Sequence, residues 1–371
     1  MATRSTTAPA REQELLAAAR AGDETAYREL VEPRRAELHA HCYRMLGSVH
    51  DAEDALQDAL LRAWRGLPRF AGRSTVRSWL YRIATNTCLD LIARRPKRVL
   101  PIDYAPAADP HGGPGEPLIE SVWVEPYPAD QLGLDDGFAA PDARYEQRES
   151  VELAFIAALQ HLPATQRAVL ILREVLGFSA AEVAETLDTS VPAVNSALQR
   201  ARKAADERLP EQSQQATLRA LGDERLRELV ESYMDAMQRG DVDAVVSMLA
   251  ADAAWSMPPL ASWFGGRDGI TEFLERGPLS GDWRWRHVPA RASGQAAVGV
   301  YNWDERERRH LSFALDVLTL EGARIKEVTA FITRSTEGTD RDYYARWPAQ
   351  PVDPQRVTAI FERFGLPSEL D

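Results

Sequence analysis

The sequence predicts a multidomain protein in which two all-α segments are followed by an α+β domain. Its 371 residues exceed the size at which a single core usually stops growing. Apolar residues recur at helical spacing in residues 11–98 and again from about 146 to 208, whereas the alternation typical of strands begins only near residue 250. The pattern gives five expected segments: residues 1–98, 99–143, 144–210, 211–340 and a tail, 341–371.

The formal net charge of −12 is unevenly distributed along the chain. Residues 1–98 carry a net charge of +5, whereas residues 99–143 contain nine acidic residues and neither lysine nor arginine. This acidic segment is rich in proline and glycine, a composition typical of linkers that cannot bury a core. The excess of acid is therefore local, and the helical segments on either side of it are free to carry basic surfaces.

The composition argues against several classes of protein. No run of about eighteen apolar residues could span a bilayer, and the opening "MATRSTTAPAREQ" lacks the apolar core of a signal peptide, so we expect a cytoplasmic protein. Cys42 and Cys88 are too few for a disulfide framework and fall inside apolar helical patterns, where a thiol acts as a small hydrophobe. His39, His41 and Cys42 do not share one helical face, so we expect no metal site, and nothing in the sequence indicates a cofactor.

The first helical segment contains two amphipathic helices joined by a loop. The stretch "DAEDALQDALLRAW" (51–64) places its apolar residues on one stripe and acidic or polar residues on the rest. After the loop "RGLPRFAGRST", the stretch "VRSWLYRIATNTCLDLIARR" (76–95) has helical spacing again. The loop and second helix are strongly basic, because residues 65–98 contain nine lysine or arginine residues and a single acid, Asp90.

Aromatic residues are interleaved with these cations. Phe70, Trp79 and Tyr81 lie among the arginines. Such a surface suits a single nucleic-acid strand, because cations pair with its phosphates and aromatic rings stack on its bases. The alternative is a solvated basic helix with no ligand.

The second helical segment ends in two helices joined by a tight turn. Ser179 and Glu182 have the spacing of a capping box, which predicts a helix start, and Ser190 can cap the next helix, residues 191–208. Two such helices form a helix-turn-helix if the second enters a DNA major groove, and an ordinary surface helix of a bundle is the alternative. The predicted buried stripe consists of Val194, Leu198, Ala201 and Ala205, and the outer face, which has no carboxylate, consists of Asn195, Ser196, Gln199, Arg200 and Lys203.

Three stretches occur in the order and spacing of one known family. They are "DAEDALQDALLRAW", "FAGRSTVRSWLYRIATNTCLD" and "LPATQRAVLILREVLGFSAAEVAETLDTSVPAVNSALQRARK". Together they resemble regions 2 and 4 of bacterial group 4 (extracytoplasmic-function) RNA polymerase sigma factors, over roughly residues 30–100 and 145–209. The resemblance implies a sigma region 2 helical bundle, a region 4 helix-turn-helix, and the partners core RNA polymerase and promoter DNA.

The resemblance also implies roles for particular residues. The 51–64 helix would dock on polymerase, with Asp54, Gln57 and Arg62 on its exposed side. Residues 70–86 would open and hold the non-template strand of the −10 element, and helix 191–208 would read the −35 element. The residues implied at the −10 element are Phe70, Arg73, Arg77, Trp79, Arg82 and Asn86. Among them, Asn86 would lie near the flipped base, and a structural role is the alternative for Trp79. The residues implied at the −35 element are Asn195, Ser196, Gln199, Arg200 and Lys203.

Two further expectations follow from the resemblance. In the family the connector between regions 2 and 4 enters the nucleic-acid channel of polymerase, and the nine carboxylates of residues 99–143 could imitate a phosphate backbone there. The sequence departs from the family at Asn195 and Ala197, where lysine and arginine are frequent. Fewer phosphate contacts would weaken the salt dependence of binding and leave the −35 preference open.

The C-terminal part resembles a different family. The stretches "RGDVDAVVSMLAADAAWSMPPL" and "FALDVLTLEGARIKEV" are similar to a SnoaL-like domain of the NTF2-like superfamily, an α+β cone. Such extensions occur in some group 4 factors, of the actinobacterial SigG and SigJ types, where they tune engagement of polymerase through contacts with the sigma domains. Aromatic residues would line a candidate pocket for an unknown small ligand or simply fill the core: Trp255, Trp263, Trp283, Trp285, Phe313 and Phe331.

Two open questions concern this C-terminal part. Asp316, His287 and His310 are the candidates for retained acid–base chemistry, and an enzyme of the polyketide-cyclase or isomerase type fused to DNA-binding helices is the alternative to a non-enzymatic sigma factor. The tail "FERFGLPSEL" (361–370) presents Phe361, Phe364 and Leu366, an expected docking segment for the sigma domains.

Overall fold

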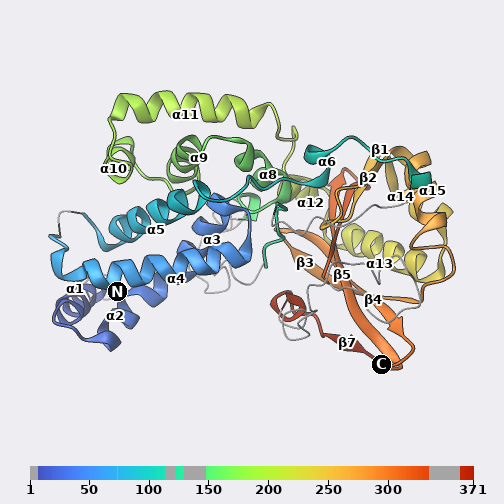
Figure 1. Cartoon of the computed structure of the whole chain (residues 1–371), viewed down its shortest axis with the longest axis horizontal. Coiled ribbons are helices and arrows are strands. Elements are labelled where there is room, and N and C mark those ends of the chain that lie inside the picture. Colours follow the sequence, from blue (N-terminus) through green and yellow to red (C-terminus); the bar gives the residue numbers. More distant parts are fainter. Residues whose placement is uncertain (1–6, 73, 113–121, 129–147, 334–359) are drawn as a thin grey trace. The chain divides into compact units, whose positions relative to one another are not determined.

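The computed structural model describes residues 7–72, 74–112, 122–128, 148–333 and 360–371 (Figure 1). They form two compact units, which we call the helical unit and the sheet unit. The helical unit comprises the described residues up to Pro96 together with Ala158–Arg208, and the sheet unit comprises those between Lys97 and Ala157 and from Leu209 onward. The predicted fold class, two all-α segments followed by an α+β domain, is confirmed.

Both predicted helical segments contribute to the helical unit. The segment up to Pro96 contains the long amphipathic helices, and the later segment ends in the predicted helix-turn-helix. The helices are α1 (Thr7–Arg20), α2 (Glu24–Val31), α3 (Arg35–Leu46), α4 (Val49–Gly66), α5 (Val76–Ile92), α9 (Ala164–Leu170), α10 (Ala180–Thr186) and α11 (Val191–Asp206), while α8 (Leu153–His161) contributes residues to both units.

Side-chain caps fix where these helices begin. Ser48 accepts a hydrogen bond from the Asp51 amide at 3.0 Å at the start of α4, and Thr75 accepts one from the Ser78 amide at 3.0 Å at the start of α5. A cap of this kind satisfies an amide that has no partner within the helix and contributes about 1 kcal/mol. The alanines and leucines of the apolar stripe of α4 face the core, and Cys42 and Cys88 are buried free thiols, as expected.

The region after α9 contains the two helix caps that the sequence predicted for the helix-turn-helix. A short π-helical turn, Ile171–Val175, follows α9. Ser179 and Glu182 form the predicted capping box at α10. Ser190 caps α11 by accepting a hydrogen bond from the Ala193 amide at 3.3 Å, and a proline stands in the first turn of α11, where a missing amide proton costs no helical bond.

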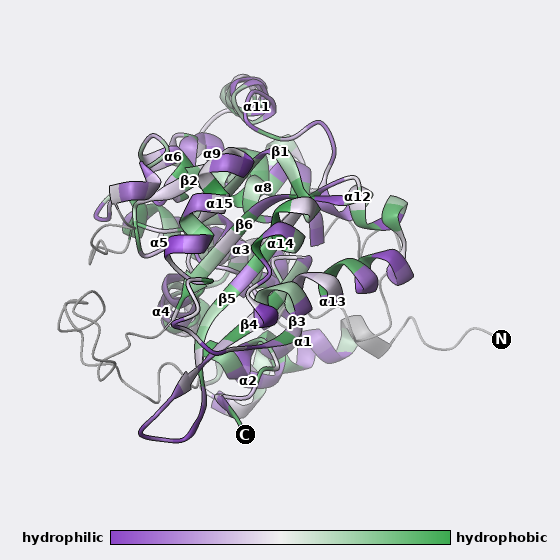
Figure 2. Ribbon diagram, turned by 90° about the vertical axis from the view of Figure 1, so that its right-hand side faces the viewer, coloured by the Kyte–Doolittle hydropathy of each residue, from purple (hydrophilic) through white to green (hydrophobic). Residues whose placement is uncertain are grey.

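The sheet unit is built on a twisted sheet in the order β2-β1-β6-β5-β4-β3, and among the strands that the structure describes only β1 and β6 run parallel. Helices α13 and α15 pack against this sheet, and their apolar faces join the strands in one core. Hydrophobic and hydrophilic residues are mixed along the strands, and the turn between β4 and β5 is hydrophilic (Figure 2). The strands are β1 (Leu249–Ser256), β2 (Trp263–Gly265), β3 (Trp285–Ala292), β4 (Gln295–Asp304), β5 (Arg309–Glu321), β6 (Arg324–Ile332) and β7 (Glu369–Leu370), and the helices are α6 (Pro101–Tyr104), α12 (Gln214–Leu221), α13 (Asp223–Arg239), α14 (Val242–Met248) and α15 (Gly266–Arg276).

The described parts of the acidic segment pack in the sheet unit, contrary to the expectation of a segment that buries no core. Val124 and Tyr127 are fully buried. The Trp123 indole donates a hydrogen bond to the Pro259 carbonyl at 3.0 Å. The Ser293 amide donates to the Tyr127 carbonyl at 2.7 Å, and the Ser293 hydroxyl accepts from the Tyr127 amide at 3.0 Å. The segment is polar on average, but burial of a few apolar side chains suffices to anchor its described parts.

The tail also packs within the sheet unit. Strand β7 pairs with the start of β5, and the Tyr301 hydroxyl donates a hydrogen bond to the Pro367 carbonyl at 2.8 Å. Phe361 and Leu366 are buried, and Phe361 lies edge-on to the Tyr301 ring at 5.3 Å. The expectation that these residues dock on the sigma domains is therefore wrong for Phe361 and Leu366, because the sheet itself provides their apolar partners.

Candidate nucleic-acid interface

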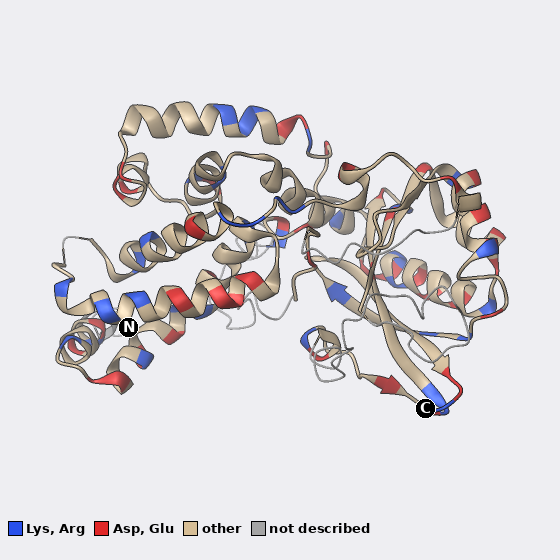
Figure 3. Ribbon diagram, viewed as in Figure 1, with Lys and Arg blue, Asp and Glu red and all other residues tan. Residues whose placement is uncertain are grey.

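Helix α4 has an acidic first half and a basic end (Figure 3). The predicted polymerase-contacting residues Asp54, Gln57 and Arg62 are all exposed, as the amphipathic pattern indicated. Arg62 is already paired, because its guanidinium lies 2.9 Å from the carboxylates of both Asp58 and Asp90. The pair with Asp90 joins α4 to α5, and both pairs keep Arg62 in place, although exposed pairs of this kind contribute little to stability.

Helix α5 and the loop before it carry the residues predicted for the −10 element. Arg82 and Asn86 are exposed on the same helix. Phe70 and Tyr81 are buried, so the expectation that these rings receive unstacked bases is wrong in this structure. Phe70 instead packs on Trp79 with ring centroids 4.8 Å apart, which fits the structural role considered for Trp79. Arg73 lies outside the described residues.

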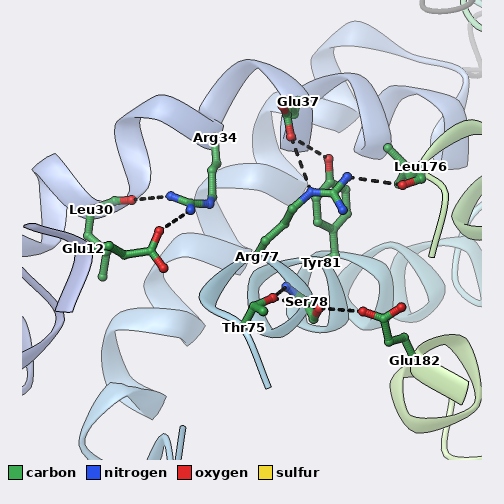
Figure 4. A network of polar contacts seen from close by, with 10 residues as sticks. All are labelled: Glu12, Leu30, Arg34, Glu37, Thr75, Arg77, Ser78, Tyr81, Leu176 and Glu182. Carbon is green, nitrogen blue, oxygen red and sulfur yellow. Dashed lines mark hydrogen bonds and ion pairs between the residues drawn. The ribbon is translucent and has the colours of Figure 1, made fainter. Parts of the chain in front are cut away.

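Arg77, the remaining residue predicted for the −10 element, contacts the segment before α10 (Figure 4). Its guanidinium donates a hydrogen bond to the Leu176 carbonyl at 3.3 Å and lies 3.9 Å from the Glu37 carboxylate. The guanidinium carbon is 5.1 Å from the centroid of the Tyr81 ring and 4.7 Å from that of Phe178. Sequence reasoning placed Arg77 on DNA and did not foresee a partner a hundred residues away.

Ser78, the next residue of α5, contacts α10 itself. The Ser78 hydroxyl donates a hydrogen bond to the Glu182 carboxylate at 3.4 Å (Figure 4). The other oxygen of that carboxylate accepts bonds from the amide and hydroxyl of Ser179. These bonds lower the pKa of Glu182, and the bond from the Ser179 hydroxyl has the largest effect. The carboxyl group of Glu182 is therefore ionised at neutral pH.

The outer face of α11 is solvent-exposed, as predicted. The five side chains that face outward there are polar or basic and all exposed: Asn195, Ser196, Gln199, Arg200 and Lys203. The basic residues gather in its second half (Figure 3). Ala197, which we expected to replace a phosphate-binding residue, is buried in the apolar stripe instead. Only Asn195 of the two departures from the family therefore lies on the outer face.

Sequence reasoning missed Arg167, a buried cation of the helical unit. Its guanidinium donates hydrogen bonds to the Met45 carbonyl, to the Gln160 side chain at 2.5 Å and to the Gln160 and Leu162 carbonyls at 3.0 and 3.3 Å. Burial lowers the pKa of Arg167 to about 10. The residue joins α9 to the carboxyl end of α3, where helix carbonyls without helical partners favour a cation. An arginine between apolar residues in "TQRAVLIL" was the available signal.

The candidate pocket residues of the sheet unit do not all come together. Trp283, Trp285 and Phe313 form one cluster, with the two indoles stacked at 5.2 Å and Trp285 5.3 Å from Phe313. Trp255 belongs to the same core. Trp263 pairs in register with Ser256, and Phe331 with Leu315, which places both on the opposite side of the sheet. A pocket lined by all six is therefore not formed.

Two titratable residues share the helix-covered side of the sheet. Asp316 pairs in register with Val298 and His287 with Val300, which lie two residues apart on β4. The Tyr233 hydroxyl of α13 donates a hydrogen bond to Asp316 at 2.8 Å, and burial raises the pKa of Asp316 to about 7. Burial lowers the pKa of His287 to about 3, and neither of its ring nitrogens has a partner among the described residues.

His310, the third candidate for acid–base chemistry, lies elsewhere in the sheet unit. It pairs in register with Trp303 and contacts that indole edge-on at 5.1 Å. Among the described residues no cluster of histidine, cysteine, aspartate or glutamate could hold a metal ion. No helix in the described ranges is long and apolar enough to cross a membrane.

Comparison with known families assigns the class of protein. The sequence model of Sigma-70 region 2 matches residues 30–98, that of Sigma-70 region 4 matches residues 152–204, and that of the SnoaL-like domain matches residues 230–328. A region 2 bundle and a region 4 helix-turn-helix in one chain define an RNA polymerase sigma factor.

Comparison with whole proteins narrows this class. The chain is 40% identical over 361 residues to the ECF RNA polymerase sigma factor SigG of Mycobacterium tuberculosis, covering 95% of this chain and 86% of the relative. It is 30% identical over 190 residues to SigW of Bacillus subtilis, covering 51% of this chain and 91% of that one. The chain therefore belongs to the extracytoplasmic-function (ECF) RNA polymerase sigma factors.

A solved structure supports the same fold. The crystal structure of the Mycobacterium tuberculosis extracytoplasmic function sigma factor SigJ matches with a TM-score of 0.50 and 24% identity, over 82% of this chain and 95% of that chain. As a sigma factor, the protein directs core RNA polymerase to promoters and initiates transcription, and it is not an enzyme. The cyclase alternative considered from the sequence is thereby set aside.

Proposed function

We propose that promoter recognition is divided between two helices of the helical unit, with α5 holding the −10 element and α11 reading the −35 element. The exposed face of α11 carries this proposal. Its five predicted side chains offer donors and two positive charges, which is the chemistry that a base edge and a flanking phosphate require, and the exposed carboxylate of Asp206 lies at the last residue of the helix. On α5, Arg82 and Asn86 are the exposed residues that supply the same chemistry to a single strand.

Run-off transcription with purified core polymerase tests this division. We expect Arg200→Ala and Lys203→Ala to reduce promoter-dependent transcription and to weaken duplex binding. The slope of log affinity against log salt should fall by about 1 for each phosphate that the variant no longer neutralises. Arg276→Ala, an exposed arginine of α15 in the sheet unit, is the matched control. Equal loss in the control and the α11 variants would overturn the assignment.

We place the polymerase contact on the exposed side of α4. Asp54 and Gln57 are exposed there. The ion pairs with Asp58 and Asp90 would hold the guanidinium of Arg62 in the position from which it contacts polymerase. Asp54→Ala should then weaken association with core polymerase while leaving binding of promoter DNA by the free factor unchanged. A variant that retains core but loses DNA would contradict the assignment.

We propose that the sheet unit modulates this activity through the connector. The described parts of residues 97–128 pack within it, so the chain between region 2 and region 4 is anchored to the extension. Most of the nine carboxylates of the expected phosphate mimic lie outside the described residues. Replacing them with amides should alter initiation and promoter escape, and unchanged transcription would remove that idea. The site of action would be the cytoplasm, where polymerase and chromosome lie.

A second candidate function of the sheet unit is to bind a small molecule. His287 carries the argument, because a buried imidazole with two unpartnered nitrogens is costly unless another group satisfies it. Asp316 and the Trp283, Trp285 and Phe313 cluster would supply a neutral carboxyl group and apolar walls. Thermal unfolding of the full chain with aromatic probe compounds tests this, since a bound ligand raises the midpoint and His287→Phe should remove the shift.

A further inference from the structure

The sheet unit holds the chain at two places that border the promoter-reading regions, and we call these places tethers. The region 2 tether consists of Arg98 and Val99 with Trp123, and the region 4 tether consists of Glu152 with Gln214 and Gln215. We propose that the tethers restrict the length of DNA between the −10 and −35 elements at which initiation occurs, with Arg98 and Glu152 as positioning residues. This inference rests on the proposed roles of α5 and α11.

The region 2 tether lies a few residues beyond the end of α5. The buried Arg98 guanidinium donates a hydrogen bond to the Trp123 carbonyl at 2.7 Å. Val99 donates one backbone hydrogen bond to residues 122–124 and accepts one from them, at 2.8 and 3.0 Å. The Trp123 indole is bonded in turn to Pro259, in the connection between β1 and β2. The chain is therefore fixed to the sheet unit soon after region 2 ends.

The region 4 tether joins the two ends of region 4. Glu152 immediately precedes α8, and its side chain is buried. Its two carboxyl oxygens accept hydrogen bonds from the amides of Gln214 and Gln215 at 3.0 and 2.8 Å, in the first turn of α12. These amides have no helical partner, so they favour a carboxylate. One side chain thus ties the start of region 4 to the chain that follows α11.

The region 4 tether is built into the sheet. The Gln214 side chain accepts a hydrogen bond from the Leu320 amide at 2.7 Å and donates one to the Leu320 carbonyl at 2.8 Å, on β5. The Gln215 side chain donates to the Gly294 carbonyl, at the turn before β4. Both glutamines are buried, and a buried polar group that loses its partner is costly. These bonds therefore fix the tether to the folded sheet.

Little slack remains between the region 4 tether and region 4. Helix α8 begins at the residue after Glu152, and the Leu153 amide donates a hydrogen bond to the Gln295 side chain of β4 at 3.0 Å. A helix has a fixed rise per residue and does not stretch as a free chain does. The start of region 4 is therefore held close to the tether.

A free connector would adapt to different spacers, whereas a tethered one should not. A flexible chain of about fifty residues, the stretch between Val99 and Glu152, has an end-to-end distance of roughly 40 Å with a broad distribution. One additional base pair moves the −35 element by about 3.4 Å and turns it by about 35° around the duplex axis. With both regions held on one folded unit, such a change breaks either a tether or a DNA contact.

Spacer length is the variable that tests the tethers. The −35 and −10 elements are first selected from a randomised promoter library with the full-length parent and core polymerase. Run-off transcription then uses templates whose spacers differ from the selected one by one or two base pairs. The assay is run at pH 8, because burial raises the pKa of Glu152 to about 7. We expect the parent to lose about 5-fold in transcription for one base pair, which corresponds to the loss of one hydrogen bond.

Glu152→Gln and Arg98→Met are the test variants. Glutamine replaces one accepting oxygen by a donor, and methionine keeps an apolar side chain without the bond to Trp123. We expect each variant to lose only about 2-fold for one base pair. Each profile is normalised to the variant's own best template, so a smaller folded fraction lowers all templates equally and leaves the ratio unchanged.

Tyr301→Phe is the matched control. It removes one hydrogen bond of a buried side chain that bonds to the tail in the same unit, away from both tethers. The control should keep the spacer profile of the parent.

The outcomes separate the tethers from the proposed function. A profile that is sharp in the parent and the control and flatter in both tether variants would support the tethers. A flat parent profile, a tether variant with the sharp profile of the parent, or an equally flattened control would each overturn them, provided that Arg200→Ala reduces transcription only on templates with a −35 element. If Arg200→Ala reduces transcription equally without that element, then α11 does not read it and the proposed function fails as well.

Discussion

The two units bury different ionisable groups. The helical unit buries two bases with a lowered pKa: burial, with a smaller effect of Arg44, lowers the pKa of His41 to about 3, and burial lowers that of Arg167 to about 10. In the sheet unit burial raises the pKa of the acids Asp316 and Glu152 to about 7, whereas burial lowers the pKa of two bases, His287 and His310. The units should therefore respond to acid in opposite directions.

The sign follows from proton linkage. An unfolded histidine binds its proton below about pH 6.5, whereas buried His41 does not, so acidification from pH 6.5 costs the helical unit stability. Unfolded Asp316 and Glu152 lose their protons near pH 4, whereas the folded groups keep them to about pH 7. Their stabilising effect is thus present at low pH and lost as the pH rises. Glu327, whose pKa burial also raises, adds to this effect, and His287 and His310, whose pKa values burial lowers, oppose it.

The largest expected effect concerns Arg167. Arg167→Met leaves the Met45, Gln160 and Leu162 carbonyls without their donor, and we expect the helical unit to lose about 3 kcal/mol of unfolding free energy. Hydrogen exchange read by mass spectrometry, which separates peptides of α9 from those of β5, measures the loss unit by unit. Arg167→Lys, which keeps a donor, should lose less. Equal losses in both units would mean that their folding is not separable.

The second prediction is that a change in pH shifts the unfolding transitions of the two units in opposite directions. Between pH 6.5 and 4.5 we expect the helical unit to lose, and the sheet unit to gain, roughly 1.4 kcal/mol per pH unit. Calorimetry of the full chain at several pH values records both transitions. Parallel movement of the two midpoints would contradict the comparison.

Asp316→Asn tests the cause of the pH response expected of the sheet unit. The amide keeps a partner for the Tyr233 hydroxyl and cannot ionise. The variant should unfold like the parent at pH 4.5 and, because the parent must charge a buried carboxyl, at a higher temperature than the parent at pH 7.5. A variant less stable than the parent at pH 7.5 would show that the ionised carboxylate is favoured in the fold.

The smallest expected effect compares one helix cap in each unit. Ser190→Ala removes the cap of α11, and Ser213→Ala removes that of α12, where the hydroxyl also donates to Glu149 at 2.7 Å. Each change should cost about 1 kcal/mol, seen as faster exchange in the first turn of its own helix. Faster exchange across a whole unit would indicate that the cap supports more than its helix.

Features with a local cause could be predicted from the sequence. The capping box at Ser179, the cap at Ser190 and the outer face of α11 follow from spacings within one or two turns, and all three are present. The turn of the β5–β6 hairpin also has a local signal, because Gly322 in "EGAR" adopts a φ of +58°, in the left-handed region that favours glycine.

Features that depend on distant partners could not be predicted. Phe70 and Tyr81 were expected on DNA, but their burial depends on packing that no local spacing encodes. The same holds for Arg77, whose partners Leu176 and Phe178 are about a hundred residues away. A count of apolar residues likewise misses Val124 and Tyr127, since a few well-placed side chains anchor a segment whose average composition is polar.

The contacts at the turn between β3 and β4 indicate where related chains can differ in length. Pro128 pairs with Ala292 at this turn, and the Arg148 carbonyl lies so near Gly294 that a Cβ there would be 2.9 Å from it. The chain thus leaves and returns to one place, and the entropy of closing a loop grows only slowly with its length, by about 0.6 kcal/mol per doubling. Insertions or deletions between the two anchor points should be tolerated in natural variants, whereas a side chain in place of Gly294 should not.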